Sequence, residues 1–196
     1  MNSCIILLMG TKGEKNRNRI VSIADDLFYK KGYEHTSFTD IADASGIARG
    51  NFYYYFKTKD DILCAVLDKR REDIDSMLVE WDKKYPDPKA RLKNYMLMLV
   101  KSQSNIENFG CPMGSLCLEL NKLRHVLQHD ANSMFEVFRF WLEKQFTALS
   151  HKKDARFLSM HIMGRCQGIS LLASTSSDVS YLNREVKLLQ QWVDEL

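Results

Sequence analysis

Apolar residues recur every three or four positions along most of the chain, as they do on the buried face of amphipathic α-helices. Polar caps, glycines and prolines interrupt this periodicity and mark where helices begin and end. The pattern therefore predicts an all-α protein. Its helices are expected at residues 12–31, 36–45, 48–56, 59–84, 89–106, 112–127, 131–149, 154–174 and 179–194.

The helix boundaries divide the 196-residue chain into four segments. Residues 14–57 hold three helices and are expected to form a small domain, preceded by an extension at 1–13. A long helix at 58–84 links this domain to a larger helical domain at 85–196. Two prolines at the start of the larger domain set that boundary, because proline lacks an amide N–H and restricts the residue before it.

Residues 36–57 predict two short helices joined by a tight turn. Thr36 and Ser37 offer hydroxyl acceptors at the first helix start, and Asp40, three residues after Ser37, adds negative charge to its first turn. Gly46 adopts positive φ without steric cost, which suits the helix end and the bend that follows. Phe52 and the phenylalanine four residues after it give the second helix a buried edge.

The other side of this second helix presents residue types that suit DNA. Arg49 can donate two hydrogen bonds to guanine, Asn51 can pair with adenine, and Gly50 allows close approach of the backbone. The hydroxyls of Tyr53 and Tyr54 suit phosphate oxygens. The pattern indicates a helix-turn-helix whose second helix reads DNA. The alternative is the solvated face of an ordinary small helix.

Three segments carry a family resemblance: GYEHTSFTDIA at 32–42, GI at 46–47 and GNFYYYFKTKDDIL at 50–63. They resemble the DNA-binding domain of the TetR/AcrR family of bacterial transcriptional regulators, and the resemblance covers roughly residues 14–65. It implies an all-α homodimer with an N-terminal three-helix helix-turn-helix DNA-binding domain and a C-terminal helical ligand-binding and dimerisation domain. We expect a repressor of a palindromic operator, with activation as the alternative, that has no cofactor and no enzymatic activity. A small-molecule signal, or a redox or electrophile signal, is expected to cause release.

The resemblance assigns roles to individual residues. Thr36, Tyr53 and Lys57 match phosphate-contacting positions, and Arg49 matches a base-reading position. Ala48 departs from the family, because a serine or threonine usually caps the reading helix, and Tyr54 stands where histidine is frequent. The full set of DNA-binding candidates is Thr36, Ser37, Arg49, Gly50, Asn51, Tyr53, Tyr54 and Lys57.

The net charge and the cysteine content limit the classes of protein to which the chain can belong. The net charge is +3, and the surplus lies in residues 1–71, which hold 12 Lys and Arg against 9 Asp and Glu. Five cysteines without a Cys-x-x-Cys pair make a secreted disulfide framework or a zinc site a poor interpretation. We therefore expect a cytoplasmic protein.

The N-terminus opens with an apolar run at residues 4–9 that is too short to span a bilayer and has no basic residue before it. No membrane partner is expected. Two interpretations remain open: Met9 is the true translation start, or residues before it form a short extension that packs against the domain.

A helix near the C-terminus carries Gly164 and Gly168, four residues apart, which allow a partner helix to approach closely. Ordinary packing within one chain is the alternative. The family resemblance favours a four-helix dimer interface built from the last two helices of each subunit. The interface candidates are Gly164, Gly168, Leu171, Leu182, Val186 and Leu189.

Cys111 precedes a proline that suits a first helical turn, so its sulfur is expected near a positive helix end, where a thiolate is favoured. It is either a sensor of oxidants and electrophiles or a small buried hydrophobe. A thiol enzyme built on Cys111 with His125 or His161 is the rival, but no further catalytic motif accompanies it. His125 and His129 lack a third metal ligand.

The C-terminal domain is rich in methionine and aromatic residues, which form a core first of all and can also line an adaptable apolar pocket. This composition favours an apolar small-molecule effector. The ligand or sensor candidates are Cys111, Met113, Cys117, Met134 and Phe138.

Overall fold

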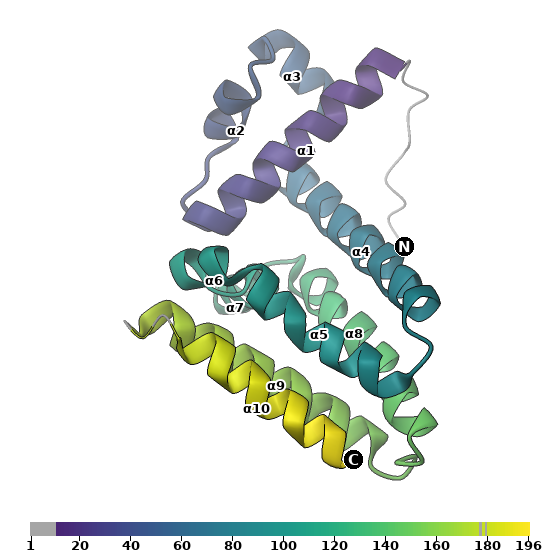
Figure 1. Cartoon of the computed structure of the whole chain (residues 1–196). Coiled ribbons are helices and arrows are strands. Elements are labelled where there is room, and N and C mark those ends of the chain that lie inside the picture. Colours follow the sequence, from purple (N-terminus) through teal and green to yellow (C-terminus); the bar gives the residue numbers. More distant parts are fainter. Residues whose placement is uncertain (1–10, 177, 179) are drawn as a thin grey trace. The chain divides into compact units, whose positions relative to one another are not determined.

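The structure is a computed structural model that describes residues 11–176, 178 and 180–196. The described residues form α-helices joined by short turns and no strand, which confirms the all-α prediction (Figure 1). Both interpretations of the N-terminus, including a start at Met9, concern residues outside those described. The helices are α1 (Thr11–Lys31), α2 (Phe38–Ser45), α3 (Arg49–Tyr55), α4 (Lys59–Lys84), α5 (Pro88–Lys101), α6 (Gln103–Phe109), α7 (Pro112–Lys122), α8 (Gln128–Ala148), α9 (Ala155–Thr175) and α10 (Tyr181–Glu195).

The chain divides into two compact units, Met1–Asp68 and Lys69–Leu196. The division falls inside α4, so this one continuous helix contributes its first ten residues to the first unit and the rest to the second. The sequence predicts a linking helix at 58–84, and α4 runs from one unit into the other.

The first unit is held together by apolar residues spaced along α1, as the periodicity of the sequence predicts. Ile20 and Ala24 are fully buried and Phe28 is nearly so, and α1 packs mainly against α2. The phenol ring of Tyr33 lies 5.3 Å from the ring of Phe28. Burying each large side chain of this kind contributes on the order of 1.5–3 kcal/mol, so this face fixes α1.

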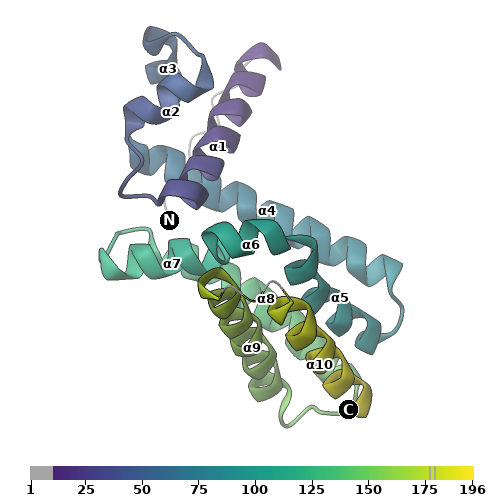
Figure 2. The ribbon, with the colours of Figure 1, turned by 60° about the vertical axis from the view of Figure 1, so that its left-hand side comes forward.

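In the second unit, α9 packs against α8, and α10 packs against α5 and α9. Both views show α9 and α10 running side by side (Figures 1 and 2). Aromatic pairs join the helices: Trp81 meets Trp141 at 5.7 Å, and Tyr95 meets Phe138 at 5.3 Å between ring centroids. The largest fully buried side chains here are Leu92, Met96, Leu116, Leu120, Met134 and Phe146.

Two helix predictions were wrong. The segment 89–106 was expected to be one helix, but it breaks at Ser102 into α5 and α6. The break carries no glycine or proline. The break directs Ile106, which is 4% exposed, into the core, and α6 packs against α9. Tertiary packing therefore sets the position of the break. The helix expected at 112–127 ends at Lys122, and Arg124 follows with a φ of 50°.

Candidate nucleic-acid interface

The start of α2 is fixed by two reciprocal hydrogen bonds between Ser37 and Asp40. The backbone N–H of Asp40 donates to Ser37 Oγ at 3.0 Å, and the backbone N–H of Ser37 donates to Asp40 Oδ2 at 2.8 Å. The two bonds form a capping box at the helix start that the sequence predicts. Hydrogen bonding to Ser37 lowers the pKa of Asp40 below its ordinary value. The bond with the Ser37 backbone has the largest effect, and the bond with the Ser37 side chain has the second largest.

The turn between α2 and α3 depends on Gly46, which ends α2 in the left-handed conformation with a φ of 63°. Its N–H donates to the Asp43 carbonyl at 3.2 Å. A Cβ at this position would lie 3.4 Å from Nη2 of Arg19, so the guanidinium of α1 sits beside the turn. Glycine is therefore required by the backbone conformation, as the sequence predicts.

Helix α3 is anchored by its aromatic inner edge. Phe52 is fully buried and Phe56 is 4% exposed, which confirms the predicted buried edge. The Phe38 ring of α2 meets Phe52 edge-on at 4.9 Å between centroids. Ala48 precedes α3 and provides no side-chain cap, so only its carbonyl accepts hydrogen bonds, from the N–H groups of Asn51 and Phe52.

The outer side of α3 is exposed. Tyr53 is 54% and Tyr54 is 60% exposed, and Asn51 and Gly50 are exposed as well. A Cβ at Gly50 would meet no atom within 4 Å, so packing within the chain does not require glycine there. Lys57 is exposed just beyond the helix, and its ammonium donates to the Tyr53 carbonyl.

One predicted phosphate contact needs correction. Thr36 is fully buried, and its hydroxyl donates to the Gly32 carbonyl at 2.7 Å. The backbone N–H of Thr36 donates to the Tyr33 carbonyl, so neither donor faces solvent. Thr36 therefore fixes the bend between α1 and α2, whereas its neighbour Ser37 is exposed.

Comparison with known proteins agrees with this geometry. The family model described as "Bacterial regulatory proteins, tetR family" matches residues 20–66. An HTH-type transcriptional regulator in the lacX 3' region of Lactococcus lactis is 28% identical over 181 residues, which are 89% of this chain and 91% of that protein. AcrR of Shigella flexneri is 25% identical over 158 residues, 79% of this chain and 72% of that protein. Residues 20–66 thus match the DNA-binding domain of the TetR family, and the chain is similar over most of its length to HTH-type transcriptional regulators.

The fold of the whole chain is also that of TetR-family proteins. A TetR-family regulator from Cytophaga hutchinsonii superposes with a TM-score of 0.81 at 19% identity, covering 96% of this chain and 98% of that one. A TetR regulator from Legionella pneumophila gives 0.79 at 24% identity, covering 97% and 98%. The chain thus has the two-part helical architecture of these regulators.

The C-terminal unit places Cys111 at the N-cap of α7, ahead of Pro112, as the sequence predicts. Its partly exposed sulfur accepts a hydrogen bond from the Gly114 N–H at 3.3 Å and another from Nε2 of Gln167 at 3.5 Å. A Cβ at Gly114 would lie 2.4 Å from Gln167 Oε1. The site is therefore tight, and only a glycine there admits the amide of α9.

The neighbouring thiols differ from Cys111 in burial. Desolvation, and then the proximity of Cys111, raise the pKa of Cys117 to about 11. The same two causes raise the pKa of Cys166 to about 12. Both thiols stay protonated near neutral pH, and a protonated thiol is a poor nucleophile.

The other ligand candidates are placed in different surroundings. Met134 is fully buried and Phe138 is 4% exposed, with the Phe138 ring packed against Tyr95. Both serve as core residues in this conformation. Met113 is half-buried in the first turn of α7.

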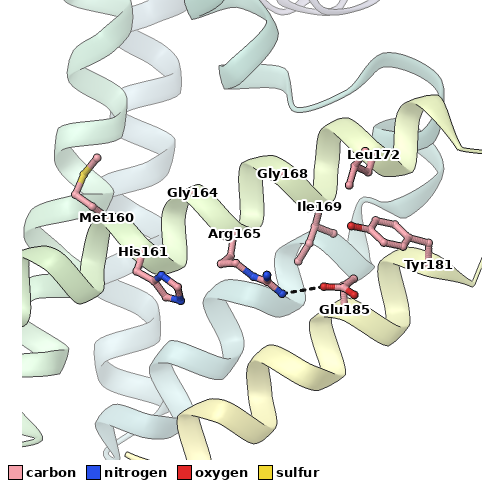
Figure 3. A pocket seen from close by; sticks show the side chains of 9 residues that line it. All are labelled: Met160, His161, Gly164, Arg165, Gly168, Ile169, Leu172, Tyr181 and Glu185. Atoms are coloured by element: carbon pink, nitrogen blue, oxygen red, sulfur yellow. Dashed lines mark hydrogen bonds and ion pairs between the residues drawn. The ribbon is translucent and has the colours of Figure 1, made fainter.

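A pocket of about 370 Å³ lies between α9 and α10 (Figure 3). Gly164 and Gly168 form part of its wall, and a Cβ at either glycine would meet no atom within 4 Å. Arg165 on α9 and Glu185 on α10 form an ion pair of 2.9 Å in it. The complete lining is Met160, His161, Gly164, Arg165, Gly168, Ile169, Leu172, Tyr181 and Glu185.

Three of the predicted interface residues need correction. Leu182, Val186 and Leu189 are 1–3% exposed and pack into the core of their own subunit. Sequence periodicity finds this stripe of α10 but does not tell an inward face from an interface. Leu171, at 63% exposed, does face outward. The large apolar side chains exposed on α9 and α10 are Phe157, Met160, Leu171, Leu172 and Leu188.

The described part of the chain was compared with the requirements of a metal site and of a membrane span. No group of three or more His, Cys, Asp and Glu residues there could hold a metal ion. Among the same residues, no helix is long and apolar enough to cross a membrane. The His161 ring lies 5.4 Å from the Trp192 ring, and the His125 ring nitrogen accepts from the Leu127 N–H. Neither arrangement points to a catalytic partner for Cys111.

Proposed function

We propose that this TetR-family regulator is a homodimeric repressor that binds a near-palindromic operator and releases it in response to a signal received by the C-terminal unit. The observation that carries the proposal is the exposed outer side of α3. Asn51, Tyr53 and Tyr54 project from a helix whose inner edge is locked by Phe52 and Phe56. A polar, aromatic face held on a rigid frame suits the major groove.

The proposed roles follow from donor and acceptor chemistry. Arg49 reads guanine through two parallel hydrogen bonds, and Asn51 reads adenine or holds a phosphate. Tyr53, Tyr54 and Lys57 hold the phosphate backbone. Gly50 keeps the surface of α3 low, and Ser37 lies at the exposed start of α2, where backbone N–H groups attract anions.

The proposed dimer forms through the outward faces of α9 and α10. Gly164 and Gly168 leave open space on this surface, and exposed apolar side chains on the same helix include Leu171 and Leu172. An exposed apolar surface of this kind is typical of an interaction site. Two reading helices then meet successive major grooves about 34–36 Å apart, which gives the operator its symmetry.

Two routes are proposed for the signal. In the first, an oxidant or electrophile modifies Cys111, whose sulfur is partly exposed while Cys117 and Cys166 are buried. In the second, an apolar small molecule enters the C-terminal unit near Met113, Met134 and Phe138 and displaces core side chains. A regulator of this class acts on the chromosome, so we infer a cytoplasmic location.

The operator is found by selecting bound duplexes from a random-sequence library, and the reading residues are then tested on it. Lys57→Ala removes one phosphate contact, so affinity should fall on every sequence and the plot of log affinity against log salt should flatten by about one unit. Arg49→Ala should cost about 1–3 kcal/mol and relax the preference at one base pair of each half-site.

Lys144→Ala provides the matched control, because it removes one exposed positive charge from α8 and should leave the salt slope unchanged. Each variant is melted alongside the wild type to confirm its fold. Operator binding that is the same in all three folded variants would overturn the reader assignment.

A further inference from the structure

The N-terminal half of α1 carries three exposed basic residues, Lys12, Lys15 and Arg19. Their spacing of three and then four residues places them along one stripe of the helix. Glu14 falls on the opposite side by the same geometry. The next acid on the stripe is Asp26, two turns further on, and it pairs with Lys30 at 2.8 Å.

This basic stripe is not needed to hold the first unit together. The inner side of α1 is formed by apolar residues such as Ile20, Ala24 and Phe28. Among the described residues, the ion pairs of the first unit do not include Lys12, Lys15 or Arg19. Three like charges on neighbouring turns repel one another, so their placement favours a negatively charged partner.

Two contacts tie the stripe to the helix-turn-helix. Nδ2 of Asn16, beside Lys15 and Lys12 on the helix, donates to the Tyr55 hydroxyl at the end of α3 at 3.0 Å. The Arg19 guanidinium lies 3.4 Å from the Cβ position of Gly46 in the turn between α2 and α3. In both views α3 lies toward the N-terminal half of α1 (Figures 1 and 2).

We propose that the basic stripe of α1 binds the phosphate backbone of DNA next to the bases that α3 reads. This inference rests on the proposed reading role of α3 and extends the DNA-contacting surface to a third helix. Because the Asn16–Tyr55 hydrogen bond holds α1 to α3, the charges of α1 come to the duplex in a fixed position relative to α3. DNA carries one negative charge per about 1.7 Å of axis, so a duplex seated on α3 offers phosphates along its flank.

The test removes charge from the stripe without touching α2 or α3. The double variant Lys12→Gln and Lys15→Gln is compared with Lys152→Gln and Lys153→Gln, a control that loses the same charge from exposed positions between α8 and α9. Affinity for a fluorescein-labelled operator duplex from the random-sequence selection, and for an unrelated duplex of equal length, is measured by anisotropy over a range of salt concentrations.

The stripe variant should bind both duplexes more weakly, because binding to phosphates carries no sequence information. Its salt slope should flatten by about 0.9 for each phosphate that is no longer neutralised, or about 1.8 for the two lysines of each half-site. The base preference found by selection should be unchanged. A stripe variant that matches the control in affinity and slope, while the wild type binds its operator, overturns the inference alone. A wild type that binds no duplex overturns the inference together with the proposed function.

Discussion

At the scale of single residues, the start of α2 shows how a local rule becomes structure. The sequence predicts a hydroxyl cap at Ser37 and a negative charge at Asp40, and the structure joins the two residues by both hydrogen bonds of a capping box. The prediction succeeded because each bond joins a side chain to a backbone group within one helical turn. Local chemistry of this kind needs no knowledge of the tertiary fold.

This cap makes a prediction about local stability. Ser37→Ala leaves the Asp40 N–H without its acceptor, which should destabilise α2 by about 1 kcal/mol and speed hydrogen exchange of its amides about fivefold. Thr39→Ala, at an exposed position in the same turn, is the control and should leave exchange nearly unchanged.

The pH dependence of the cap has a definite sign. The folded pKa of Asp40 lies below its ordinary value of 3.8, chiefly because the Ser37 N–H donates to the charged carboxylate. The charged Asp40 carboxylate therefore stabilises the folded state above the pKa that Asp40 has in the unfolded chain. This stabilisation is lost as pH falls through the pKa of the folded state. An NMR titration of the Asp40 carboxyl should have its midpoint below 3.8. A midpoint at or above that value would contradict the capping bond.

The environments of Thr36 and Cys111 could not be predicted from the local sequence. The threonine hydroxyl was expected on DNA, but it donates to the carbonyl of Gly32 inside the first unit. The environment of Cys111 includes Gln167, a residue 56 positions away in the sequence, and no local pattern connects the two. Burial and contacts between distant segments depend on the packed fold, which single-residue chemistry does not specify.

At the scale of helices, the apolar period predicts well wherever a cap or a glycine marks the boundary. The start of α4 follows from Thr58, whose hydroxyl accepts from the Asp61 N–H at 3.0 Å. The break between α5 and α6 has no such marker, and the prediction missed it. The sequence prediction also placed the inward face of α10 at the dimer interface. Leu182 and Val186 are buried in their own subunit, but they repeat with the same period as the residues of an interface helix.

The α9 surface makes a prediction about assembly. A side chain at Gly168 meets no atom of its own subunit within 4 Å at the Cβ, so Gly168→Phe should fold normally. In the proposed dimer the added ring blocks close approach of the partner helix, and analytical ultracentrifugation should show monomers. Operator affinity should then fall because the two half-sites are no longer bound as one linked unit.

Lys144→Phe adds an equally bulky ring to an exposed position of α8 and is the control. It should remain dimeric. If Gly168→Phe sediments as a dimer as well, the interface lies on other helices, whereas monomers in both variants would point to a general effect of the added ring.

At the scale of the whole molecule, α4 provides a covalent route between the two units because it runs unbroken through the division at residue 68. Arg70, two residues past that division, donates from Nη1 to the Pro112 carbonyl at 2.8 Å. This bond joins α4 to the first turn of α7, directly after Cys111. A change at the sulfur can therefore act on α4 through a short chain of named contacts.

From this arrangement we predict that modification of Cys111 releases DNA. N-ethylmaleimide is the probe: the Cys111 thiolate adds to its carbon–carbon double bond, a C–S bond forms, and a proton from water completes the adjacent carbon. The adduct has to displace the amide of Gln167, because the space beside Gly114 is already filled. Close-packed surroundings resist added volume, so α7 should shift and carry the Pro112 carbonyl away from Arg70.

Operator affinity measured before and after the reagent should fall in the wild type and stay constant in Cys111→Ser. Cys117 and Cys166, with pKa values of about 11 and 12, should react slowly near neutral pH because less than about one thiol in a thousand is ionised. Arg70→Met should still be alkylated, as mass spectrometry would show, but should respond less because its link to α7 is gone. Equal loss in the wild type and Cys111→Ser would assign the response to another cysteine, and no loss in either would leave the apolar core of the C-terminal unit as the proposed entry point for a signal.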